Sequence, residues 1–225
     1  MSKARLDTQA QMEAAFNHLS SAEPAMSGLV ERVGPLHLSQ TDDYFFTLVE
    51  SICSQQLSSK VADTIIGRIR ALASNKEHIE AEDILSIPDQ ALRDVGLSWS
   101  KVRYVKDLAQ KVADGEVHLA RIATMDDEEI VRELTLVKGI GRWTAEMFLM
   151  FSLARPDVFA VGDYGLQVGL KRLYDLPDLP KSAQMRELAE PWRPYRSYAS
   201  LYLWRAITGD ADDRWAGEIQ ATSKE

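Results

Sequence analysis

The chain's most telling stretch is Leu136-Val137-Lys138-Gly139-Ile140-Gly141-Arg142-Trp143-Thr144-Ala145. Helical periodicity precedes and follows it, so the two glycines mark a hairpin between two helices. Glycines in a G-x-G spacing allow backbone N–H groups to approach a phosphate closely. The helix that opens at Arg142 adds the positive end of its dipole. We therefore predict a phosphate-binding hairpin at this point of the chain.

Composition narrows the classes of protein to consider. The 225 residues are 45% hydrophobic and 27% charged, which is typical of a soluble globular protein. The net charge of −8 argues against a non-specific DNA coat, although it permits a local basic face. Cys53 is the one cysteine in the sequence, so intrachain disulfides and cysteine-bound iron–sulfur clusters are excluded. The histidines show no metal-ligand spacing.

Targeting signals are missing from the sequence. The first residues contain no apolar core of a signal peptide, and no apolar run is long enough to span a membrane. We therefore expect no membrane association and a cytoplasmic protein, which would lie with the nucleoid in a prokaryote or in the nucleus of a eukaryote.

The hydrophobic pattern is helical throughout. Apolar residues recur at helical spacing, and β-branched alternation is nearly absent. The patterned segments are 12–19, 45–52, 61–72, 102–112, 130–137, 143–153, 166–174 and 188–204. The segment 143–153 is apolar almost all round, which predicts a helix buried at the centre of a bundle. These patterns predict an all-α protein.

The hairpin and a following aspartate resemble a known family. The aspartate is Asp163, in Asp157-Val158-Phe159-Ala160-Val161-Gly162-Asp163-Tyr164. Together the two features resemble the HhH-GPD superfamily of DNA repair glycosylases, which is named for this hairpin, a Gly/Pro-rich loop and the aspartate. Lys138 stands where the family often has proline, and Val161-Gly162 replaces its more typical residue pair.

Three further stretches resemble the alkylpurine branch, the 3-methyladenine DNA glycosylase II subfamily. They are Ser51-Ile52-Cys53-Ser54-Gln55-Gln56-Leu57-Ser58, Gly96-Leu97-Ser98-Trp99-Ser100-Lys101 and Pro191-Trp192-Arg193-Pro194-Tyr195-Arg196-Ser197-Tyr198. The resemblance implies two helical lobes with an active-site cleft between them. Residues 43–160 would form the lobe with the hairpin at 137–142, and residues 1–42 plus 161–225 would form the second. No separate N-terminal β domain is expected, so the chain resembles the compact all-helical branch.

The resemblance also implies roles for single residues. Asp163 would stabilise the positive charge that develops on the sugar, or deprotonate the attacking water. It would equally serve as the N-cap of the next helix, and the two roles are compatible. Gln56 would fill the space left by the displaced base. Trp143 stands where members that also cut the backbone have a lysine nucleophile, and tryptophan cannot form a Schiff base.

The predicted site residues fall into three groups. An aromatic and sulfur-containing base pocket would comprise Trp143, Trp204, Tyr44, Met147 and Tyr164. Ordinary core packing is the alternative for all five residues and the commoner role for the last three. DNA contacts are expected from Gly139, Gly141, Lys138, Ile140, Arg142, Thr144, Gln55, Gln56, Leu57, Ser58, Ser98 and Lys101. No cofactor is required, although the family's hairpin can hold Na⁺ or K⁺ on backbone carbonyls, here near Val137 and Ile140.

The resemblance thus implies a monofunctional alkylpurine DNA glycosylase that acts as a monomer on double-stranded DNA with alkylated bases. It would flip the base, hydrolyse the N-glycosidic bond and leave an abasic site, without lyase activity. Two alternatives stay open from the sequence. One is a non-catalytic helix–hairpin–helix protein that binds damaged DNA, and the other is a glycosylase of the same superfamily for a different damaged base.

Overall fold

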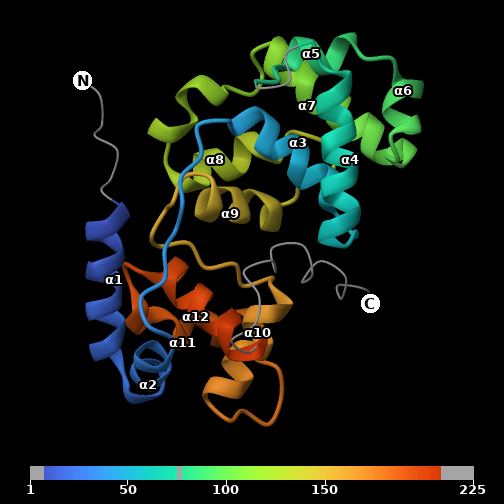
Figure 1. Cartoon of the computed structure of the whole chain (residues 1–225). Coiled ribbons are helices and arrows are strands. Elements are labelled where there is room, and N and C mark those ends of the chain that lie inside the picture. The colour runs from blue at the N-terminus through green and yellow to red at the C-terminus, as the bar shows by residue number, and fades with distance from the viewer. Residues whose placement is uncertain (1–7, 75–77, 209–225) are drawn as a thin grey trace. The chain divides into compact units, whose positions relative to one another are not determined.

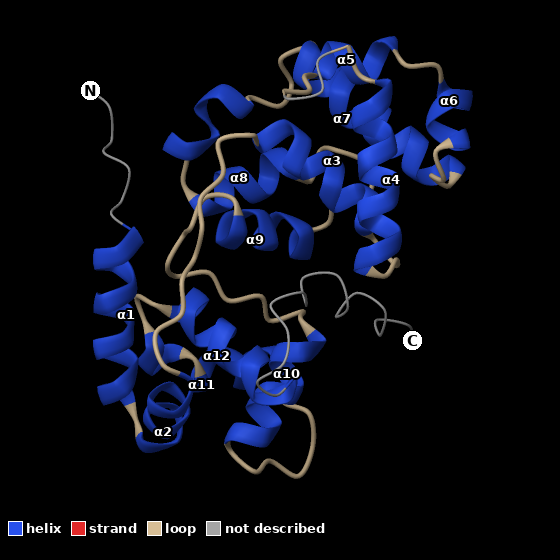
Figure 2. Cartoon of the chain, in the orientation of Figure 1, coloured by secondary structure: helices blue, strands red, loops and turns tan. Residues whose placement is uncertain are grey.

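The computed structural model describes residues 8–74 and 78–208. Figure 2 shows helices and loops but no strand within these ranges. The all-α prediction is therefore confirmed. None of the helices in the described ranges is both long enough and apolar enough to cross a membrane.

The chain folds into two compact units. Among the described residues, one unit comprises 8–40 and 149–208, and the other comprises 41–74 and 78–148. The second boundary, between Phe148 and Leu149, falls inside helix α9 (Arg142–Phe151). The two units are called here the hairpin unit (41–148) and the aspartate unit (8–40 with 149–208).

The hairpin unit is built from the helices of the middle part of the chain (Figure 1). They are α3 (Tyr44–Ser54), α4 (Ser59–Leu72), α5 (Ala81–Ser86), α6 (Asp89–Asp94), α7 (Trp99–Ala113), the 3₁₀ helix η1 (Leu119–Thr124), α8 (Asp127–Leu134) and the first part of α9. Helix α3 packs against α4 and α7, and α5 packs against α7. Fully buried Phe46, Ile52 and Val105 belong to this core.

The aspartate unit is assembled from segments that lie far apart in the sequence. It contains α1 (Thr8–Ala22), α2 (Pro24–Val33), α10 (Tyr164–Leu173), α11 (Ser182–Leu188), the 3₁₀ helix η2 (Glu190–Trp192) and α12 (Arg196–Thr208). Helix α10 packs on α12, α1 packs on α2, and α2 also contacts α12. Helix α12 is almost entirely buried, as its run from Ser197 to Trp204 shows.

Two expectations about buried faces need correction. On α4 the middle of the apolar stripe, Ile65 and Ile69, is buried, but Val61 and Leu72 are 46% and 41% exposed. These two lie in the first and last turns of the helix. Helix α9 is also not buried all round, because Trp143 and Met147 are only half-buried. They stand four residues apart and therefore share one helix face.

Candidate nucleic-acid interface and active site

Asp163 is a buried carboxylate at the start of a helix. It is 2% exposed and is the N-cap of α10, where its Oδ1 accepts a hydrogen bond of 2.7 Å from the backbone N–H of Leu166. The same oxygen accepts a hydrogen bond of 3.0 Å from Nε1 of Trp204 on α12. A buried carboxylate is costly without such partners. The two donors therefore hold the carboxylate in a defined orientation.

Small residues on α10 allow α12 to come close. A Cβ atom added to Gly165 would lie 2.9 Å from two atoms of the Trp204 indole, and one added to Gly169 would lie 2.9 Å from Cβ of Leu203. Any larger residue at these positions would push α12 away. The spacing of four residues puts both glycines on one face of α10, and this face brings the indole of Trp204 within reach of Asp163.

The loop that leads to Asp163 is anchored by the first turn of α12. Arg196 donates to both carboxylate oxygens of Asp157, from Nε at 2.6 Å and from Nη2 at 3.0 Å. Ser197 is fully buried, and its Oγ accepts a hydrogen bond from the N–H of Val158 at 2.9 Å and donates to the carbonyl of Arg155 at 2.6 Å. The segment Pro191–Tyr198, singled out in the sequence, therefore positions the loop before the aspartate.

The glycine hairpin has the expected backbone geometry. Gly139 has a φ of +85°, a conformation that side-chain-bearing residues rarely adopt. A Cβ atom at this position would lie 2.3 Å from the ring of Tyr104, so the ring packs directly on the glycine backbone. Helix α9 begins at Arg142, immediately after Gly141. The first N–H groups of any helix lack intrahelical partners, and this arrangement suits an anion.

The turn after α3 contains a strained residue. The helix ends at Ser54 with Gln55 as its C-cap, and the next residue, Gln56, has a φ of +57° and an exposed side chain. A non-glycine residue in this left-handed conformation is uncommon and costs about 1–2 kcal/mol. The side-chain amide of Gln55 donates from Nε2 to the carbonyl of Gly139 at 2.8 Å. The Gln55–Gln56 turn is thus tied to the hairpin.

Several of the motifs separated in the sequence meet around one surface pocket of about 460 Å³. Its lining residues are Gln55, Gln56, Ser98, Ser100, Lys101, Tyr104, Trp143 and Thr144. Two of the three stretches that resemble the alkylpurine glycosylases, 51–58 and 96–101, thus meet the glycine hairpin stretch in the hairpin unit. Tyr104 was not predicted from the sequence, because a single half-buried tyrosine in a helical pattern carries no local signal; its contact with Gly139 depends on the fold.

The predicted DNA contacts either line this pocket, as Ser98 does, or are close in the sequence to residues that line it. Ser98 is the N-cap of α7 and accepts a hydrogen bond of 3.2 Å from the N–H of Lys101. Ser58 is the exposed N-cap of α4, and Leu57 beside it is half-buried. Ile140 is 4% exposed, so its side chain packs inside and only its backbone suits a ligand contact.

The basic side chains around the hairpin are largely engaged within the protein. Lys138 pairs with Asp107 at 3.2 Å. Arg142 pairs with Glu128 and, from Nε at 3.0 Å, with Glu146, and its hydrogen bond lowers the pKa of the Glu128 carboxyl. These carboxylates offset much of the positive charge. An anion at the hairpin would therefore rely on backbone N–H groups more than on lysine and arginine.

The five predicted base-pocket residues are divided between the two units, with Tyr44, Trp143 and Met147 in the hairpin unit and Tyr164 and Trp204 in the aspartate unit. Trp143 lines the pocket of the hairpin unit, and Met147 lies one turn further along α9. Tyr164 is 44% exposed at the start of α10. Trp204 is only 1% exposed, and it stacks on Phe151 with ring centroids 6.1 Å apart. In this structure its distinguishing contact is the hydrogen bond to Asp163.

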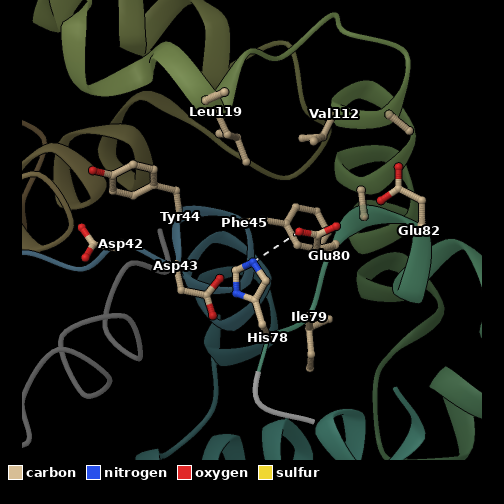
Figure 3. Close-up of a pocket in the computed structure, with 13 residues that line it drawn as sticks. Asp42, Asp43, Tyr44, Phe45, His78, Ile79, Glu80, Glu82, Val112 and Leu119 are labelled. Carbon is tan, nitrogen blue, oxygen red and sulfur yellow. Dashed lines mark ion pairs between the residues drawn. The ribbon is translucent and has the colours of Figure 1, made fainter. Parts of the chain in front are cut away.

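Tyr44 lies beside a different pocket, of about 420 Å³, which Figure 3 shows in close-up. The pocket lies at the start of α3, the opposite end from the Gln55–Gln56 turn, and the ring of Tyr44 contacts Phe148 edge-on at 5.8 Å. Its walls carry Asp42, Asp43, Glu80 and Glu82. Because these four carboxylates would repel the phosphate backbone, this pocket does not suit DNA.

In the described ranges, no group of three or more histidine, cysteine, aspartate and glutamate side chains could hold a metal ion. The expected Na⁺ or K⁺ site depends on hairpin carbonyls. The carbonyl of Val137 accepts a hydrogen bond of 3.1 Å from the N–H of Ile140. A carbonyl oxygen has two lone pairs, so this bond is compatible with a cation, which stays a prediction.

Comparison with known proteins agrees with this geometry. Residues 49–194 match the family model described as HhH-GPD superfamily base excision DNA repair protein. The chain is 32% identical to a Schizosaccharomyces pombe protein named DNA-3-methyladenine glycosylase 1, over 84% of each chain. It is 33% identical to a Bacillus subtilis protein named putative DNA-3-methyladenine glycosylase YfjP, over 85% of this chain and 70% of the relative.

Solved structures show the same likeness. A crystal structure of DNA-3-methyladenine glycosidase from Bacillus halodurans is similar with a TM-score of 0.77 and 35% identity, covering 86% of this chain and 89% of that one. The structure of Schizosaccharomyces pombe 3-methyladenine DNA glycosylase in complex with abasic DNA has a TM-score of 0.75 and 32% identity, covering 85% and 95%.

The helical hairpin, its G-x-G backbone and the buried aspartate define a helix–hairpin–helix protein of the kind that acts on DNA. The family match extends over more than half of the chain. The chain therefore belongs to the HhH-GPD superfamily of base excision DNA repair proteins.

Proposed function

We propose that this protein is a monofunctional DNA glycosylase that releases alkylated purines of the 3-methyladenine and 7-methylguanine class. Asp163 carries the proposal, because a carboxylate that is 2% exposed is held in place by two hydrogen-bond donors. A protein that merely bound DNA would need no such group. The names of the relatives from Schizosaccharomyces pombe and Bacillus subtilis support the choice of substrate.

The reaction begins with removal of the damaged base from the stacked duplex. Flipping costs a few kcal/mol, and less where alkylation has weakened pairing. Gln56 is exposed and projects from a strained turn, so its side chain suits the space that the base leaves. The hairpin N–H groups and the start of α9 would bind a backbone phosphate and so fix the position of the strand.

The chemical step breaks the bond between the sugar C1′ and the base nitrogen. The bonding electron pair leaves with the base and neutralises its positive charge, so little acid catalysis is required. The sugar becomes an oxocarbenium-like cation, which the carboxylate of Asp163 stabilises electrostatically. Water then adds to C1′ and loses a proton, with the carboxylate as the base, and an abasic site results.

Trp143 accounts for both the preferred substrate class and the end point of the reaction. The face of an indole attracts a cationic base by about 0.5–2 kcal/mol. Trp143 lines the pocket of the hairpin unit and is partly exposed there. Because it carries no amine, no Schiff base forms with the sugar and the DNA backbone is not cut.

The test is base release from duplex DNA treated with a methylating agent, followed by chromatography of the free bases. The wild-type protein should release 3-methyladenine or 7-methylguanine, and Asp163→Asn should reduce the rate by at least about 10²-fold. Asparagine is also a good N-cap, and its oxygen can still accept the bonds from Leu166 and Trp204, so folding and DNA binding should persist. Undiminished release by this variant would contradict the mechanism.

The same experiment addresses the two alternatives. Retained DNA binding without release of any base by the wild-type protein would favour a non-catalytic binding protein. Release of a different damaged base would favour another glycosylase of the superfamily. We further propose that the protein acts as a monomer in the compartment that holds the chromosomal DNA.

A further inference from the structure

The start of α7 is fastened to the end of α3 by one lysine. The ammonium group of Lys101 donates to the carbonyls of Cys53 at 2.7 Å and Gln55 at 2.5 Å. The last carbonyls of a helix have no intrahelical partner, and a positive charge there also complements the helix dipole. Lys101 therefore caps α3 from a neighbouring helix.

This cap is the first link of a chain that ends at the hairpin. The backbone carbonyl of Gln55 accepts a hydrogen bond from the ammonium group of Lys101. The side-chain amide of Gln55 donates to the carbonyl of Gly139 at 2.8 Å. Gln56, with its left-handed backbone, follows immediately. The strained turn is thus held on one side by Lys101 and on the other by the hairpin.

A phosphate contact is the competing role for Lys101. Two of the three N–H donors of the ammonium are already used by backbone carbonyls. The side chain is half-buried, and this burial lowers the pKa of Lys101 below its usual value. Engagement with a phosphate would compete with bonds that the turn requires.

We propose that Lys101 is a positioning residue that holds the Gln55–Gln56 turn in the conformation that presents Gln56 to the DNA, and that it does not supply a phosphate contact. The proposal rests on the proposed function, since it concerns how the space of the flipped base is filled. It predicts that Lys101 affects base flipping through the turn, without changing the number of ions released on binding.

The test compares Lys101→Met with Lys106→Met. Lys106 lies on the same helix and caps the end of α5 in the same manner, donating to the carbonyls of Leu85 at 3.0 Å and Ile87 at 2.6 Å. Neither of those residues lines the pocket around Trp143. The pair therefore controls for the loss of one charge and of two lysine-to-carbonyl bonds.

Three quantities are measured for each variant on duplex DNA with a single lesion. They are the slope of log affinity against log salt, the fluorescence of a base analogue beside the lesion as a reporter of flipping, and the single-turnover rate of base release. We expect Lys101→Met to reduce flipping and release at least about tenfold with an unchanged salt slope. Lys106→Met should match the wild type in all three.

A fall of about one unit in the salt slope of Lys101→Met, with flipping intact, would show a phosphate contact and overturn the proposal. Wild-type behaviour of Lys101→Met in all measurements would overturn it too. If that variant does not fold, Gln55→Met removes the bond to Gly139 and leaves the lysine cap in place; reduced flipping supports the proposal and normal flipping contradicts it. Failure of the wild-type protein to release any base would instead contradict the proposed function, and flipping and salt slope would still be measurable.

Discussion

The hydrogen bond between Trp204 and Asp163 is the residue-scale contact that most affects the proposed chemistry. It connects two helices, α12 and α10, and it exists because Gly165 leaves room for the indole. Trp204→Phe should keep most of the ring and remove the donor. A hydrogen bond to a charged group contributes about 1.5–3 kcal/mol, so we expect base release to become about 10- to 100-fold slower.

The control for this prediction is Trp192→Phe. In the described part of the chain, Nε1 of Trp192 is buried without a hydrogen-bond partner, and the side chain is fully buried. Both variants lose similar volume from a core and should lose about 1–3 kcal/mol of stability in urea unfolding. Base release should fall in the Trp204 variant alone; equal loss in both would assign the effect to packing.

Trp143 leads to a second prediction about a single residue. With no amine at this position, incubation with damaged DNA and sodium borohydride should trap no covalent protein–DNA complex, and the product strand should stay intact until it is treated with alkali. Gel electrophoresis under denaturing conditions measures both. A trapped complex would show that another lysine acts as a nucleophile and that the enzyme also cleaves the backbone.

At the scale of the elements, the hairpin between α8 and α9 depends on Gly139. Alanine at this position would have to adopt a φ of +85° and would place its Cβ atom 2.3 Å from the ring of Tyr104. We expect Gly139→Ala to lower the free energy of unfolding by more than about 2 kcal/mol. In contrast, Gly141 has no positive φ, and a Cβ atom added to it would meet no other atom within 4 Å.

Urea unfolding of Gly139→Ala and Gly141→Ala checks this difference. The second variant should unfold close to the wild-type midpoint, because its methyl group meets no neighbour. If both variants were equally destabilised, the hairpin would tolerate alanine at neither glycine, and the contact with Tyr104 would not be the cause of the destabilisation.

Most of the longer helices could be predicted from the sequence because their apolar residues repeat with helical spacing, but α2, α5 and α6 lie outside the patterned segments. The hairpin and the N-cap role of Asp163 were likewise visible as local motifs, and the structure has Asp163 at the start of α10. Local sequence patterns do not show which residues that are distant in the chain will contact each other. The Trp204–Asp163 bond, the Tyr104–Gly139 contact and the cap made by Lys101 all join residues that are distant in the chain.

At the scale of the whole molecule, helix α9 contains residues of both units. The boundary between the units falls in the last turn of α9, where backbone hydrogen bonds of the helix join residues of both units, so we expect the two units to unfold together. Cys53 reports on the hairpin unit, because it is fully buried and burial raises its pKa to about 12. At pH 7 to 8 the thiol is therefore protonated, and since the thiolate is the reactive form, iodoacetamide should modify the folded protein slowly.

The measurement follows Cys53 alkylation by mass spectrometry and the loss of helix by circular dichroism over the same range of urea. Coincident midpoints are expected for a single transition. Alkylation at a lower urea concentration than the loss of helix would mean that the hairpin unit opens by itself.

The division of the aspartate unit between residues 8–40 and 149–208 has a consequence during synthesis. Helices α1 and α2 leave the ribosome first, but α10 and α12, which complete their unit, are made after the whole hairpin unit. Translation of residues 41–148 takes roughly 5–20 s at typical rates. Throughout that interval α1 and α2 have only each other as partners, because η2, which contacts α1, and α12, which contacts α2, have not yet been made. The nascent chain thus has its longest exposure to chaperones and proteases at its beginning.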